Sequence, residues 1–204
     1  MANTVQQVCD ALDLSSGSGA KLEQLLDELE RWNRKINLTA IRDRDEMITA
    51  HLADSLVAEP LIRGPRVLDV GTGPGFPGLP LAIARPDLSF TLLDSNNKKI
   101  QFVQHAAGVL GLDNVEAVWA RTEDYAPGYR FDSVTARALA TVPRLLELAG
   151  KHVGEDGVFV ALKGREFAEE LEDITDEWDY TVEPLSVPGL EAGSRHAVLL
   201  HRKT

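Results

Sequence analysis

The sequence predicts an α/β protein with a mostly parallel, doubly wound sheet, preceded by a helical extension. Short β-branched runs alternate with helical segments from residue 66 to about 163, which is typical of repeated βαβ units. A glycine-rich turn, VLDVGTGPGFPG at 67–78, follows the first run, as expected where a strand enters the first crossover helix. The 204 residues, 44% of them hydrophobic, suffice for one domain with a substantial core.

The amino-terminal part is predicted to be helical, because apolar side chains recur three and four positions apart. The predicted helices occupy 5–14, 18–35 and 46–58, and Pro60 ends the third. We expect residues 1–62 to form a helical extension and residues 63–204 to form the sheet domain, with both parts packed as one compact unit.

The sheet domain is predicted from the change to short β-branched runs. The expected strands are 67–70, 90–94, 115–119, 131–135 and 158–163, and the helices between them are 78–84, 96–110 and 142–152. A further helix is expected at 165–176. The last two strands, 181–187 and 196–203, are joined without room for a crossover helix, so we expect them to be antiparallel.

The chain is acidic, with 21 Lys and Arg against 32 Asp and Glu and a net charge of −11. This balance argues against a nucleic-acid partner, because affinity for phosphates comes largely from Lys and Arg. However, residues 166–183 hold nine acids and no Lys or Arg, and without them 23 acids face 21 bases, a net charge of −2. We expect these acids to form one solvated helical face turned away from any RNA, so the composition does not exclude an RNA partner.

Other compositional features exclude whole classes of protein. No segment approaches the roughly 18 apolar residues of a membrane helix, and the amino terminus lacks the basic and apolar regions of a secretory signal. Cys9 is the single cysteine, and no Cys/His cluster accompanies it. We therefore expect a cytoplasmic monomer with no disulfide, no metal and no membrane partner.

The glycine-rich turn is the sharpest indication of a ligand. Gly71, Gly73 and Gly75 follow an apolar strand, and glycines accept positive φ and allow close approach of a ligand. In a doubly wound sheet this turn lies at the carboxyl edge, where ligands bind. Asp94 ends the next strand, about 20 residues further on, where a carboxylate can hydrogen-bond ribose hydroxyls. The pattern predicts a cofactor that contains a nucleoside.

Two cofactors fit this pattern. Gly73, Gly75 and Gly78 match the GxGxxG of dinucleotide-binding proteins, so a dehydrogenase or nucleotide-binding module stays open. Asp69, two residues before Gly71, would repel the pyrophosphate of a dinucleotide. S-adenosylmethionine has no phosphate and carries a cationic sulfonium and an ammonium, so Asp69 favours this cofactor. The alternative role for Asp69 is to cap the turn that follows it.

The sequence contains no motif for an elaborate methyl-transfer chemistry. No Asn-Pro-Pro-Tyr-like tetrapeptide follows the fourth strand, and Cys9 has no Pro-Cys context for covalent catalysis at a pyrimidine. A guanine N7 acceptor would be consistent with this absence of motifs, because N7 already presents a lone pair. Displacement at the sulfonium then requires alignment and no general base, so we assign no catalytic residue.

Several motifs together resemble one known family over nearly the whole chain. The runs are WNRKINLTA (32–40), HLADSL (51–56), the glycine-rich turn, LLDSNNKKIQFVQ (92–104), RTED (121–124), TARAL (135–139), LKGR (162–165) and SRHAVLLHRK (194–203). They are similar to the RsmG, or GidB, family of bacterial 16S rRNA guanine-N7 methyltransferases. The resemblance implies a Rossmann-like class I methyltransferase that uses S-adenosylmethionine. It also implies a guanine in the 530 loop of 16S rRNA as the target, in the small ribosomal subunit or an assembly intermediate.

The resemblance also implies a set of residues that contact the cofactor: Gly71, Phe76, Thr122, Glu123 and Arg137. The site chemistry described above adds Asp69, Gly73 and Asp94. Candidates for RNA contact are the basic residues expected in loops at the same sheet edge, namely Lys163, Arg165, Arg195 and His196. His51 is expected to be structural.

Overall fold

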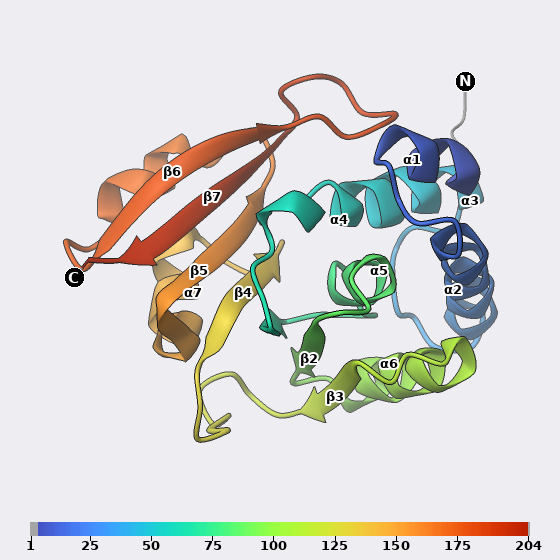
Figure 1. Ribbon diagram of the computed structural model, residues 1–204, viewed down its shortest axis with the longest axis horizontal. Coiled ribbons are helices and arrows are strands. Elements are labelled where there is room, and N and C mark those ends of the chain that lie inside the picture. The colour runs from blue at the N-terminus through green and yellow to red at the C-terminus, as the bar shows by residue number, and fades with distance from the viewer. Residues whose placement is uncertain (1–3, 204) are drawn as a thin grey trace.

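The computed structural model describes residues 4–203 and contains one seven-stranded sheet (Figure 1). The strand order is β3-β2-β1-β4-β5-β7-β6. The strands are β1 (Arg66–Val70), β2 (Ser89–Asp94), β3 (Val115–Trp119), β4 (Phe131–Arg137), β5 (Val153–Lys163), β6 (Trp178–Leu185) and β7 (Arg195–Arg202). The first five run parallel, and β7 is antiparallel to both β5 and β6. The prediction of a mostly parallel sheet with an antiparallel last strand is confirmed.

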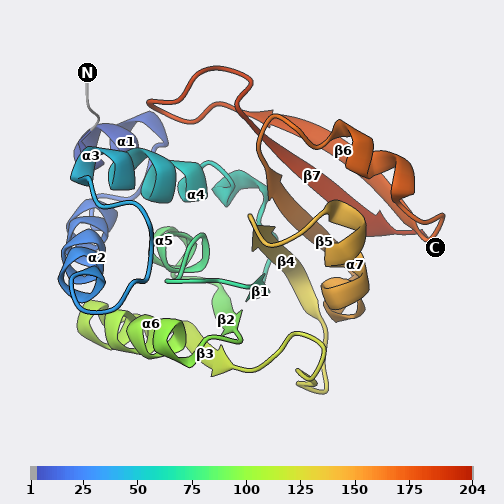
Figure 2. The same ribbon diagram turned by 180° about the vertical axis from the view of Figure 1, so that it is seen from behind.

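The helices cover both faces of the sheet (Figures 1 and 2). One face carries α1 (Val5–Ala11), α2 (Ser18–Asn33), α5 (Gly78–Ala84) and α6 (Asn97–Leu110), together with the helix of residues 44–56. The opposite face carries α7 (Val142–Ala149), which continues into a short 3-10 helix, η3 (Gly150–His152). None of the helices between residues 4 and 203 combines the length and the hydropathy that crossing a bilayer requires.

The helix predicted at 46–58 is present, but its middle is wider than an α-helix. The run consists of α3 (Arg44–Met47), a π-helical segment η1 (Ile48–Ala53) and α4 (Asp54–Leu56), followed by η2 (Glu59–Leu61). Asp43 caps its start by accepting a hydrogen bond from the Glu46 N–H. π-helical turns often occur at functional sites, and this one carries His51 next to Asp54.

The prediction of a helix at 165–176 is wrong. Only η4 (Ala168–Asp173) is helical, as a 3-10 helix, and β6 begins at Trp178 rather than at 181. Phe167, Leu171 and Ile174 have helical spacing and do pack against the core. However, in an α-helix the acids of this segment would lie three and four residues apart and would repel one another, and no Lys or Arg offsets this repulsion.

The helical extension shares its core with the sheet domain. Leu25, Leu26 and Leu29 of α2 are completely buried in the same cluster as Phe102 and Val103 of α6. A second cluster, between the sheet and α7, contains residues of the sheet domain such as Phe131 and Phe159. Because the extension covers apolar surface of α5 and α6, separating it would expose both parts to water.

We predict that Leu26→Ala lowers the free energy of unfolding of the whole chain by about 2 to 5 kcal/mol, the range for large-to-small core substitutions. Urea unfolding should give one transition by circular dichroism and by fluorescence in a background that keeps Trp178, at the far end of the sheet, as the single tryptophan, with Trp32→Phe and Trp119→Phe. The control is Val109→Ala, since Val109 on α6 is 41% exposed and its truncation should change stability by less than about 0.5 kcal/mol. Separate unfolding of the extension would contradict this prediction.

Candidate functional site

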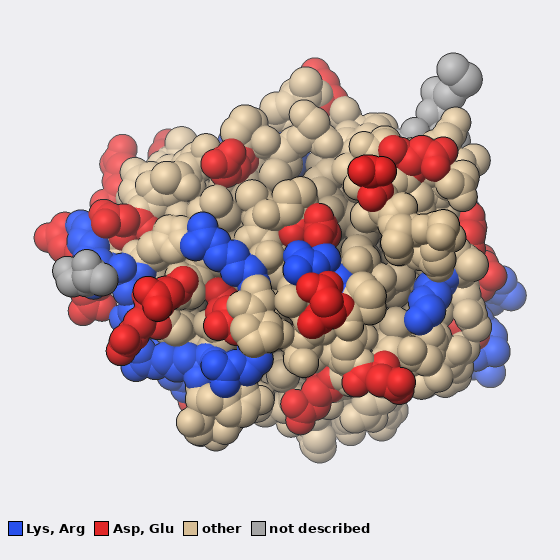
Figure 3. Space-filling model, in the orientation of Figure 1, with Lys and Arg blue, Asp and Glu red and all other residues tan. Residues whose placement is uncertain are grey.

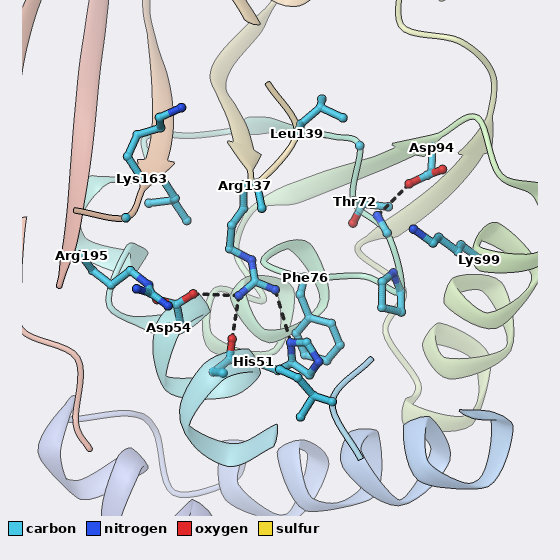
Figure 4. A pocket seen from close by; sticks show the side chains of 18 of the residues that line it. His51, Asp54, Thr72, Phe76, Asp94, Lys99, Arg137, Leu139, Lys163 and Arg195 are labelled. Carbon is cyan, nitrogen blue, oxygen red and sulfur yellow. Dashed lines mark hydrogen bonds and ion pairs between the residues drawn. The ribbon is translucent and has the colours of Figure 1, made fainter. Parts of the chain in front are cut away.

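A cavity of about 870 Å³ opens at the carboxyl edge of the parallel strands (Figure 4). Its walls come from the glycine-rich turn after β1, the ends of β2, β4 and β5, and the helix of residues 44–56. The volume lies in the range of small-molecule sites. Of the predicted site residues, the cavity is lined by Gly71, Gly73, Phe76, Asp94, Arg137, Lys163 and Arg195.

The glycine-rich turn has the backbone conformation that the sequence predicted. Gly71 has φ +65° and Gly73 has φ +59°, values that other residues rarely adopt. A Cβ on Gly71 would meet the methyl groups of Leu139 at 2.9 Å, whereas a Cβ on Gly73 would find only the Lys99 ammonium, at 3.9 Å. Gly73 therefore presents bare backbone to the cavity, with space in front of it.

Asp94 fixes this turn from the neighbouring strand. Its carboxylate accepts hydrogen bonds from the N–H of Gly73, at 2.8 Å, and from the N–H of Asn96, at 2.7 Å. The carboxylate remains partly exposed and lies on the cavity wall (Figure 4). The glycine-rich turn and the acid that ends β2 thus meet at one wall, as the sequence predicted.

Asp69 lies beneath the turn and does not line the cavity. It is 1% exposed and accepts hydrogen bonds from the Thr72 hydroxyl (2.6 Å), the Gly78 N–H (2.9 Å) and the Thr135 hydroxyl (3.1 Å). Burial raises the pKa of Asp69 to about 6, against the opposing effect of these hydrogen bonds. This placement corresponds to the alternative role, in which Asp69 caps the turn and positions residues that do reach the cavity.

Arg137, at the end of β4, joins the sheet to the helical extension. Its guanidinium donates to the Ala50 carbonyl and to the Asp54 carboxylate, both at 2.8 Å (Figure 4). The other carboxylate oxygen of Asp54 accepts from Arg195 Nε of β7 at 2.6 Å. Because Asp54 is buried and holds two guanidinium groups, it ties three distant segments together at the cavity.

His51 packs against Phe76 at the back of the cavity. The two rings are stacked, with centroids 4.7 Å apart and an angle of 21° between the planes. His51 Nε2 lies 3.0 Å from the Thr39 hydroxyl. Burial, together with the nearby Arg137, lowers the pKa of His51 to about 4, so the ring is neutral at pH 7. His51 therefore supports Phe76, in line with the structural role expected from the sequence.

The basic residues expected to contact RNA have their side chains engaged within the protein. Lys163 pairs with Glu170 at 2.7 Å and donates to the Ala140 carbonyl. Arg165 pairs with Glu191, and Arg195 pairs with Asp54 as described. His196 lies against Phe167, with its Nδ1 3.3 Å from the Gly164 carbonyl. Arg165 and His196 do not line the cavity.

Thr122 and Glu123, in the loop after β3, also lie outside the cavity lining. Their carbonyl groups face residues that follow α7. The Glu123 carbonyl accepts from Lys151 Nζ at 2.6 Å, and the Thr122 carbonyl lies 3.4 Å from His152 Nε2. The structure therefore brings together the residues predicted from β1, β2 and β4, and leaves this loop apart from them.

The sequence reasoning missed several residues that line the cavity, among them Asp54, Lys99, Leu139, Glu166 and Glu170. The expectation that the acidic segment faces away from the site is wrong, because Glu166 and Glu170 lie on the cavity wall. Glu170 turns inward because it pairs with Lys163 and also accepts from the Val142 N–H, at 2.7 Å, at the start of α7. Lys99 was detectable, since it lies in the first turn of the helix that follows Asp94.

The sheet order, the glycine-rich turn and the acid at the end of β2 define the Rossmann-like fold of S-adenosylmethionine-dependent methyltransferases. Solved structures of this class share the fold. The glycopeptide N-methyltransferase MtfA, in complex with S-adenosylmethionine, has a TM-score of 0.64 at 12% identity over 75% of this chain and 95% of its own. The model of the GidB family, described as rRNA small subunit methyltransferase G, matches residues 18–198. The chain belongs to this family.

Individual relatives agree with this assignment. A ribosomal RNA small subunit methyltransferase G from Actinobacillus succinogenes is 41% identical over 98% of this chain and 100% of its own length. A protein of the same name from Legionella pneumophila is 46% identical over 85% of this chain and 82% of its own. Membership of this family sets aside the alternative of a dehydrogenase.

We predict that Asp69→Asn changes how stability depends on pH. Because the pKa of Asp69 is raised, the folded state binds a proton more tightly than the unfolded chain does. The contribution of Asp69 to the free energy of unfolding therefore falls as pH rises from about 4 to 6. The pKa of His51 is lowered, so the contribution of His51 to the free energy of unfolding rises with pH over nearly the same range. Asp69→Asn removes the Asp69 contribution and keeps that of His51. The free energy of unfolding of the variant minus that of the parent should therefore rise by roughly 3 kcal/mol between pH 4 and pH 6.

Urea unfolding at several pH values measures this difference, in which the contributions of all other groups cancel. Asp113→Asn is the matched control, because Asp113 is exposed at the opposite edge of the sheet and should leave the parent profile unchanged. A constant difference between Asp69→Asn and the parent over pH 4 to 6.5 would show that Asp69 does not titrate as described.

Proposed function

We propose that this protein transfers a methyl group from S-adenosylmethionine to N7 of a guanine in the 530 loop of 16S rRNA. The observation that carries the proposal is the hydrogen bond between the Gly73 N–H and the Asp94 carboxylate. This hydrogen bond joins the glycine-rich turn to a partly exposed acid that could accept from ribose hydroxyls, on one wall of the cavity in a chain of this methyltransferase family. The names of the relatives support ribosomal RNA of the small subunit as the substrate.

The residues of the cavity fit S-adenosylmethionine. A Cβ at Gly73 would enter open space in front of the turn, so the backbone there is free to lie close to a ligand. Asp94 uses its carboxylate for two backbone N–H groups and still has acceptor capacity for ribose hydroxyls. We propose that Gly71, Gly73, Phe76 and Asp94 hold the cofactor, and that Asp69 acts through the turn it caps.

Methyl transfer to guanine N7 requires mainly that the reacting atoms are aligned. The bound cofactor supplies an electrophilic methyl group on its sulfonium, and guanine N7 carries a lone pair and no proton. The task of the protein is therefore to hold N7 in line and to exclude water. Methylation leaves a positive charge on the guanine, and the carboxylate of Glu166 on the cavity wall would favour that charge.

Arg137 and Asp54 have a positioning role in this proposal. Their ion pair at 2.8 Å fixes the end of β4 against the helix of residues 44–56. The loop after β4 carries Leu139, which lies 43% exposed over Gly71. The acceptor base would enter between this loop and the helical extension, where the cavity is open.

We predict that Asp94→Ala weakens binding of S-adenosylmethionine by about tenfold or more, because it removes a ribose acceptor and the brace of the turn together. Isothermal titration of the purified protein measures the dissociation constant. Asp113→Ala, a carboxylate removed from the opposite edge of the sheet, is the control and should bind as tightly as the parent. Equal affinity of Asp94→Ala and the parent would remove Asp94 from the cofactor site.

The reaction itself is tested with small ribosomal subunits from cells that lack the gene. We expect methyl label from S-adenosylmethionine to enter one guanine of the 530 loop. Reduction with borohydride followed by aniline cleaves RNA at N7-methylguanosine, and primer extension then locates the cut. The control is subunits from complemented cells, which should accept no label. Label at another position or on another atom would contradict the proposed target.

A further inference from the structure

The ion pairs described above raise the question of which cations face the RNA. Lys163, Arg165 and Arg195 each have a carboxylate partner within the protein. The pairs of Lys163 and Arg195 are largely buried, so a phosphate would first have to break them, whereas the pair of Arg165 with Glu191 is exposed and weak. The phosphate contacts of the substrate therefore need other side chains near the cavity.

Trp119 is an exposed aromatic residue at the rim of the cavity. It is 61% exposed, more than any other large apolar side chain among residues 4–203. It is the last residue of β3 and pairs in register with Asp94 of β2. Its indole N–H donates to the Ser95 carbonyl at 3.0 Å, and Ser95 itself lines the cavity. The indole is thus anchored by its edge at the site while most of its surface meets solvent.

Two exposed cations lie close in sequence to the two partners of this hydrogen bond. Lys98 lies in the first turn of α6, three residues after Ser95, and Arg121 follows Trp119 by two residues. Neither forms an ion pair within the part of the chain that the structure describes. An exposed aromatic ring together with exposed cations is the combination that binds single-stranded nucleic acid, through stacking and phosphate contacts.

We propose that Trp119, Lys98 and Arg121 bind an unpaired nucleotide of the rRNA close to the target guanine. The base stacks on the indole, and the two cations contact the flanking phosphates. This inference rests on the proposed function and identifies the side of the cavity, beyond β2 and β3, on which the RNA strand continues. In Figure 3, basic and acidic side chains alternate over the face shown, without the continuous basic surface that would bind RNA by charge alone.

The first test is Trp119→Ala, assayed with small ribosomal subunits that lack the methyl group. We expect KM for the subunit to rise about tenfold, within the range for loss of one stacked base. The kcat and the dissociation constant of S-adenosylmethionine should stay unchanged. Trp119→Phe, which keeps a stacking ring, should restore most of the affinity. The control is Tyr180→Ala, an aromatic residue 44% exposed on β6 at the far edge of the sheet, which should leave KM unchanged.

The second test is the double substitution Lys98→Gln with Arg121→Gln. Each lost phosphate contact should reduce the slope of log KM against log salt by about 0.7, the value for single-stranded nucleic acid. An unchanged KM for Trp119→Ala in an otherwise active enzyme would overturn the inference and leave the proposed function standing. Weaker binding of S-adenosylmethionine by Trp119→Ala would overturn it too, since the indole would then serve the cofactor. Failure of the unsubstituted protein to methylate small subunits would instead overturn the proposed function.

Discussion

The cavity depends on one buried carboxylate, Asp69. It accepts hydrogen bonds from Thr72 in the turn, from the Gly78 N–H at the start of α5 and from Thr135 on β4. A carboxylate in this position costs free energy to bury, and the three donors offset much of that cost. In return, β1, the glycine-rich turn and the neighbouring strand are held in one geometry. Gly73 can then present bare backbone to a ligand without a loose loop, so Asp69 orders the site without lining it.

Asp54 plays the corresponding part between the extension and the sheet. Arg137 on β4 and Arg195 on β7 both pair with this buried carboxylate, and the π-helical segment before it carries His51 onto Phe76. The amino-terminal helices are therefore a wall of the cavity as well as a cover for the sheet. The family match likewise extends into the extension, from residue 18 onward.

Sequence patterns predicted the features that depend on local chemistry. Alternation of short apolar runs and helices predicted the parallel sheet, and Gly71, Gly73 and Asp94 predicted the wall that they form together. What failed depends on side-chain contacts that local patterns do not specify. The charge of Lys163 could not be known to be neutralised, since Glu170 lies in a segment whose acids indicated a solvated helix. Likewise Asp69 had two readings, and only the positions of Thr135 and Gly78 show that it points beneath the turn.

The acidic segment has a consequence for the choice among RNA molecules in a cell. Glu166 and Glu170 stand on the cavity wall, and most of the excess negative charge of the chain lies in the segment that begins with them. An enzyme of this charge gains little from neutralising phosphates at random, so it spends little time on the abundant RNA that is not its substrate. Which RNA the enzyme binds then depends on the fit of one folded target and not on the abundance of that RNA. The enzyme can therefore reach a scarce ribosomal target, whereas a strongly basic surface would hold it on many other RNA molecules.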